Sequence, residues 1–128
     1  MQVTVPISVG ELLDKITILE IKAERIADPE KRRNIDRELS ELSARRDALG
    51  LGRPELRPLI DDLAEVNRRL WEVEDDLRRL EAKQDFGPDF IRLARSVYRE
   101  NDLRAEIKRE LNRLTGSHLV EEKSYSAG

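Results

Sequence analysis

Polar side chains interrupt the apolar faces of two predicted helices, and these residues are the best placed to do chemistry. Glu20 falls within the Leu/Ile stripe of the first helix, and Glu100 and Arg104 replace apolar residues in the middle of the last one. A buried, unpaired carboxylate is costly, so Glu20 requires a partner, and Arg104 or Lys108 could supply one between helices. Alternatively, Glu20 reaches water, and Glu100 and Arg104 form a solvated i,i+4 pair.

Acidic pairs on the third predicted helix match a metal site only superficially. Asp62 with Glu65 and Glu72 with Asp75 have the spacing of magnesium-binding carboxylates in helical pyrophosphohydrolases. The two pairs, however, lie about 15 Å apart on one helix, too far to share an ion. His118 has no second His or Cys with which to bind zinc, and no Ser-His-Asp relay is recognisable. We therefore expect no metal and no cofactor.

Composition limits the classes of partner. The chain has 128 residues, 24 basic and 27 acidic, with a formal net charge of -3, which argues against nucleic acid as a partner. No stretch is apolar enough to span a membrane, and no leader is apparent, so a cytoplasmic protein is expected. Aromatic residues are only 4% of the chain, so elongated helices that share Leu/Ile seams fit better than a compact sphere.

Capping signals divide the chain into four predicted helices within a single domain, 1–128. Ser8 has the spacing of a capping box, Asp28 and Pro29 suit the start of a second helix, and Pro88 that of a fourth. Gly50 and Gly116 suit helix ends. The predicted helices cover about 8–27, 29–49, 55–84 and 88–115, followed by a polar tail, 117–128.

The third predicted helix carries the strongest periodic signal in the chain. Eight apolar residues in a 3,4 repeat, from Leu56 to Leu80, form one seam, and the short loop after it predicts an antiparallel partner. We therefore predict an all-α four-helix bundle made of two helical hairpins, the second long and antiparallel. Ile18 and Ile21 lie opposite the main stripe of the first helix, which places that helix inside the bundle or between two copies of the chain.

Several segments resemble a family of small bacterial proteins with no assigned function. They are PISVGELLDKITILEIK (6–22), Val66-Asn67 with Leu70-Trp71, LARSVY (93–98), Asn101-Asp102 and EEKSY (121–125). The resemblance supplies no catalytic residues, and it implies an association with sugar transferases. The segments and the helix beside them hold the candidate ligand-binding or polar-core residues: Lys15, Glu20, Lys22, Asn67, Trp71, Arg95, Tyr98, Asn101, Asp102, Arg104 and Lys108.

Two functions are compatible with these features. The leading hypothesis is a non-enzymatic interaction module that self-associates, with a dimer favoured, through a surface that includes the first helix. It could be an accessory to the assembly of cell-envelope sugars or polysaccharides. The alternative is a small enzyme or a domain that binds an anionic ligand among helices one, three and four. Polar residues that pair with one another would favour the first hypothesis, and a cavity lined by them would favour the second.

Overall fold

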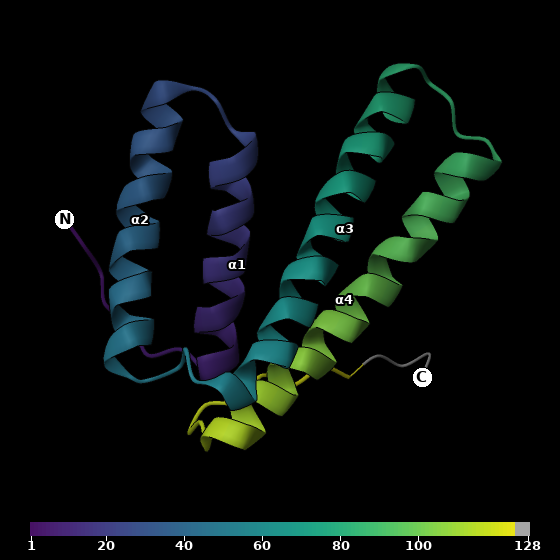
Figure 1. Cartoon of the computed structure of the whole chain (residues 1–128). Coiled ribbons are helices and arrows are strands. Elements are labelled where there is room, and N and C mark those ends of the chain that lie inside the picture. The colour runs from purple at the N-terminus through teal and green to yellow at the C-terminus, as the bar shows by residue number, and fades with distance from the viewer. Residues whose placement is uncertain (125–128) are drawn as a thin grey trace.

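Four α-helices and one 3₁₀ turn make up the computed structural model, which describes residues 1–124. The helices are α1 (Val9–Arg25), α2 (Pro29–Ala48), α3 (Arg57–Ala82) and α4 (Pro88–Thr115), with the turn η1 (Pro54–Leu56) ahead of α3. No strand occurs in that part of the chain. The predicted all-α bundle of two hairpins is confirmed. Figure 1 shows the α1–α2 hairpin beside the α3–α4 hairpin, the two meeting at one end and diverging toward the other.

Local capping explains where the helices begin and end. The Ser8 hydroxyl accepts a hydrogen bond from the third N–H of α1 at 3.1 Å, and the Asp28 carboxylate caps α2 at 3.0 Å. Each bond satisfies a backbone donor that has no partner within the helix. Gly50 and Gly116, which follow α2 and α4, have positive φ angles of 66° and 63°. The predicted caps are confirmed, except that the Glu11 carboxylate of the capping box pairs with Lys15 and Lys108.

Helix α1 is the central element, because it contacts α2, α3 and α4. Its Leu13 and Ile16 lie in the core, while Ile21 is buried and Ile18 half-buried on its other side. Two apolar sides on α1 are therefore explained by packing within the chain, without a second copy. The buried core of α1, η1, α3 and α4 contains Leu12, Leu13, Ile16, Leu56, Leu63, Val66, Ile107 and Leu111.

The α3–α4 hairpin extends well beyond this core. Every buried residue of α3 lies before residue 68, and every buried residue of α4 lies after residue 106. We call residues 68–82 and 88–106 the distal hairpin. Arg69 of α3 and Glu100 of α4 join its two helices through hydrogen bonds of 2.9–3.1 Å. No helix within residues 1–124 is long and apolar enough to cross a membrane.

Candidate functional site

A buried carboxylate, Asp14 of α1, lies at the centre of the most extensive polar cluster. Asp14 is 0% exposed. Arg104 of α4 donates from Nε to Oδ1 at 2.9 Å and from Nη2 to Oδ2. Asn67 of α3 donates from Nδ2 to the same Oδ1 at 2.9 Å and to the Thr17 hydroxyl at 2.9 Å. Three helices therefore meet at one carboxylate, and all of these bonds form within the chain.

Lys108 of α4 connects Asp14 to a second layer of charges. Its Nζ lies 3.8 Å from Asp14 Oδ2 and donates to Glu11 Oε2 at 2.6 Å and to Glu121 Oε2 at 3.0 Å. Lys15 lies 3.5 Å from the other oxygen of Glu11. Three cations and three carboxylates make up this polar cluster: Lys15, Arg104 and Lys108 with Glu11, Asp14 and Glu121. Its formal charges balance.

The shifts in pKa favour the charged forms in this cluster. A hydrogen bond to Asp14 raises the pKa of Arg104. Burial alone would lower the pKa of Lys108, but its bonds to Glu11 and Glu121, together with the charges of Asp14 and Glu11, raise it. Burial alone would likewise raise the pKa of Glu11, but the bond from Lys108 helps to lower it. These three groups are therefore poor proton donors or acceptors near neutral pH, where general acid–base catalysts need to exchange a proton.

The amino terminus of α1 is also closed by partners within the chain. The N–H of Val9 donates to Ser117 Oγ at 3.2 Å, and the N–H of Gly10 donates to Asn112 Oδ1 at 2.7 Å. The N–H of Glu11 donates to the Ser8 hydroxyl. A free helix amino terminus can bind an anion, but the first three N–H groups of α1 are already occupied.

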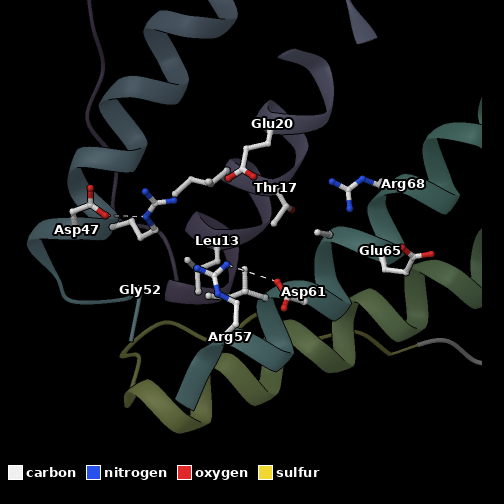
Figure 2. A pocket seen from close by; sticks show the side chains of 13 residues that line it. Leu13, Thr17, Glu20, Asp47, Gly52, Arg57, Asp61, Glu65 and Arg68 are labelled. Carbon is white, nitrogen blue, oxygen red and sulfur yellow. Dashed lines mark hydrogen bonds and ion pairs between the residues drawn. The ribbon is translucent and has the colours of Figure 1, made fainter. Parts of the chain in front are cut away.

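Of the two alternatives for Glu20, burial is wrong, and a side chain that reaches water is confirmed. Glu20 is exposed, and the buried acidic residue of α1 is Asp14. Glu20 projects where α2 and α3 diverge, so its side chain reaches the opening between them (Figures 1 and 2). Asp14 could have been found from the pattern, because Asp14, Thr17 and Ile21 share one helical stripe and burial of Ile21 was expected. Arg104 and Lys108 do neutralise a carboxylate of α1, but it is not Glu20.

The interpretation of Glu100 and Arg104 as a pair along α4 is also replaced. Glu100 pairs with Arg69, and Arg104 with Asp14, so both side chains reach other helices. Asn101 Oδ1 lies 3.4 Å from Arg104 Nη1, at the edge of the cluster. Asp102 lies 3.9 Å from Lys123 of the tail.

The remaining candidate residues do not join the polar cluster. Lys22 is half-buried near the end of α1, and Trp71 is half-buried on α3, one turn beyond Asn67. Arg95 and Tyr98 are exposed on α4. Hydrogen bonds from Arg95 and then from Arg99 lower the pKa of Tyr98. Tyr125 of the EEKSY segment lies outside the described residues.

A surface pocket lies beside the cluster, among α1, the end of α2 and α3. Its volume is about 540 Å³. Figure 2 shows Arg57, Arg68 and Glu20 around it. Arg57 pairs with Asp61 at 3.7 Å and Arg68 with Glu24 at 3.5 Å, so both arginines already face a carboxylate. Asp14, Asn67, Arg104 and Lys108 do not line this pocket.

A second, larger pocket of about 810 Å³ lies between the amino-terminal segment and α2. Val3, Val5 and Leu49 at its edge are exposed. Within residues 1–124, no group of three or more His, Cys, Asp or Glu residues could hold a metal ion. The geometry is thus that of a closed polar cluster, with pockets beside it.

Comparison with known proteins identifies a family to which no activity is assigned. A family model described as a family of unknown function (DUF6165) matches residues 3–128. The chain belongs to this family. No curated protein and no solved structure matches it significantly. The family therefore assigns no substrate or partner to the polar cluster.

Proposed function

We propose that this protein is a non-enzymatic helical module that self-associates through its distal hairpin. The observation that carries the proposal is the absence of any buried residue in that part of α3 and α4, although its apolar seam continues to the tip. The seam residues there are only half-buried: Leu70, Val73, Leu77, Leu80, Phe90, Leu93 and Val97.

A pair of helices cannot cover its own seam from both sides. Two such hairpins packed face to face make a four-helix bundle, in which each helix buries an apolar stripe against its neighbours. The α1–α2 hairpin reaches only the start of the distal hairpin, where Arg25 pairs with Glu72 at 3.3 Å, and it diverges from the hairpin beyond that point (Figure 1). It therefore cannot supply the missing pair. A second copy of the chain would supply it.

The closed polar cluster supports a structural role over a catalytic one. Its charged groups pair with one another, and three of them are held further into their ionised forms. An accessory role in the assembly of cell-envelope sugars, which the family resemblance implies, would suit such a module, because an accessory needs no catalytic residues of its own.

Sedimentation analysis tests this proposal. We expect a monomer–dimer equilibrium with the dimer dominant at tens of micromolar, and the variant Ile91→Glu should weaken it about tenfold, or about 1.4 kcal/mol. Ile91 is 55% exposed on the distal part of α4, so the variant should fold normally. A charge in the dimer interface is costly to bury, even where Arg95, one turn along α4, can pair with it.

Leu114→Glu is the matched control. Leu114 is a large apolar residue on the same helix and is 44% exposed, but it lies at the opposite end of α4. Its replacement should leave the equilibrium unchanged. A wild-type protein that stays monomeric at tens of micromolar would contradict self-association, and equal effects of the two variants would exclude the distal hairpin as its site.

A further inference from the structure

We infer that the second copy binds in parallel, with the two hairpin tips side by side, so that each α3 packs against the partner's α4. This inference rests on the proposed self-association and adds its geometry. Three observations support it: the face of the hairpin left uncovered beyond α1, the opposite charges of the two distal helices, and the register that Arg69 and Glu100 set between them.

The uncovered face is the continuation of the face that α1 covers at the base of the hairpin. There, Asn67 contacts Asp14, and Asn112 contacts Gly10. Side chains three, four and seven residues apart share one face of a helix, so both contact stripes can be followed toward the tip. From Asn67 the stripe continues through Trp71, which lies beside the end of α1, where Arg25 pairs with Glu72 at 3.3 Å, and then to Glu74. From Asn112 it runs back through Lys108, Asn101 and Tyr98 to Ala94. With the neighbouring Ile91 and Arg95, the distal face comprises Trp71, Glu74, Ile91, Ala94, Arg95 and Tyr98.

This face is suited to bury apolar surface. Ile91 and Tyr98 are 55% and 52% exposed, and Trp71 is half-buried. Aromatic residues are enriched in the cores of protein interfaces, because each buries a large area with few rotatable bonds.

The two distal helices have opposite net charge. Residues 72–85 contain six acidic and three basic side chains, whereas residues 88–99 contain one acidic and three basic ones. Among residues 1–124, neither Arg95 nor Arg99 has a carboxylate within ion-pair distance, and Arg99 lies over the Tyr98 ring at 5.9 Å. Within residues 1–124, the one ion-pair partner of Glu74 is Arg78, one turn along α3, with a nitrogen–oxygen distance of 3.8 Å. In the described part of the chain, Arg95 and Arg99 therefore lack an ion-pair partner, and the one partner of Glu74 lies on its own helix.

The register between the helices places these charges at the same height. Arg69 and Glu100 are level, because their side chains bond directly between antiparallel helices. Glu74 follows Arg69 by five residues, and Arg95 precedes Glu100 by five, so Glu74 and Arg95 are level as well. By the same count, Trp71 is level with Tyr98.

Charge then selects between the two ways of stacking identical hairpins face to face. A two-fold axis along the hairpin places each α3 on the partner's α4, with Glu74 opposite the partner's Arg95 and Trp71 opposite the partner's Tyr98. A two-fold axis across the hairpin places α3 on α3 and α4 on α4, so that arginines face arginines. Opposite potentials favour the parallel dimer, because like charges brought together at an interface oppose binding.

Charge reversal with rescue tests the arrangement. In the full chain, Glu74→Arg and Arg95→Glu should each weaken dimerisation about tenfold in sedimentation equilibrium, because each creates two like-charge contacts per dimer. The double variant carrying both changes should return to within about threefold of wild type, since its charges again oppose across the interface. Glu106→Arg, an exposed change on α4 outside the distal face, should have no effect. Circular dichroism should show the same helix content for all four variants.

The possible outcomes distinguish the parallel arrangement from the self-association on which it rests. A wild-type dimer that neither single reversal weakens would overturn the parallel arrangement and leave self-association standing. Single reversals that weaken the dimer without rescue in the double variant would overturn it too. A wild-type monomer at every accessible concentration would overturn both.

Discussion

Replacing Asp14 by alanine should lower the free energy of unfolding by about 3 kcal/mol, a large share of the stability of a small protein. The variant removes the carboxylate that accepts from Arg104 and Asn67 and that lies near Lys108. The Lys108 side chain is only 9% exposed. Without Asp14, its buried positive charge would be balanced only by Glu11 and Glu121. Breaking a buried ion pair from one side is costly for that reason. Urea unfolding monitored by circular dichroism gives the value.

Glu20→Ala is the control for this prediction. Glu20 is an acid on the same helix, but it is exposed, and it makes no hydrogen bond or ion pair within residues 1–124. Its loss should change the free energy of unfolding by no more than about 0.5 kcal/mol. Equal effects of the two substitutions would show that Asp14 does not hold the three helices together.

Gly10→Ala should destabilise the protein by about 2 kcal/mol, although alanine is the better helix former. A Cβ at position 10 would lie 2.6 Å from the backbone oxygen of Lys108 and 3.1 Å from Asn112 Oδ1. The backbone of α4 cannot move aside without disturbing the bond from the Gly10 N–H to Asn112. A lower urea midpoint would show that α1 and α4 require this close approach.

Gly52→Ala provides the matched comparison. A Cβ there would meet no atom within 4 Å, and Gly52 is not in a left-handed conformation. The substitution should therefore be neutral or slightly stabilising, because it restricts the unfolded chain. If Gly10→Ala is as stable as Gly52→Ala, the contact between α1 and α4 is looser than the structure indicates.

Local signals predicted the helices well because capping depends on a few neighbouring residues. Ser8 and Asp28 cap the helices that follow them, and Gly50 and Gly116 take left-handed conformations where α2 and α4 end. Each feature requires a particular side chain, or none, within one turn of the helix end. The antiparallel hairpin followed from a long seam and a short loop.

The polar cluster was harder to predict because its contacts are distant in sequence. Asp14 is separated by 53 residues from Asn67 and by 90 from Arg104. A helical projection gives the direction of a side chain, but not which helix covers it. Glu20 and Asp14 both lie in apolar directions, and only the divergence of α2 from α3 leaves Glu20 in solvent. Glu121 was not foreseen, because the tail has no periodic pattern.

Amide hydrogen exchange at several protein concentrations tests the central claim most directly, because it reports which segments self-association covers. We expect the amides of residues 68–82 and 88–106 to exchange more slowly as concentration rises through the dimerisation range, while those of α2 do not change. Exchange in the distal hairpin that is independent of concentration would contradict the account, as would new protection confined to α2.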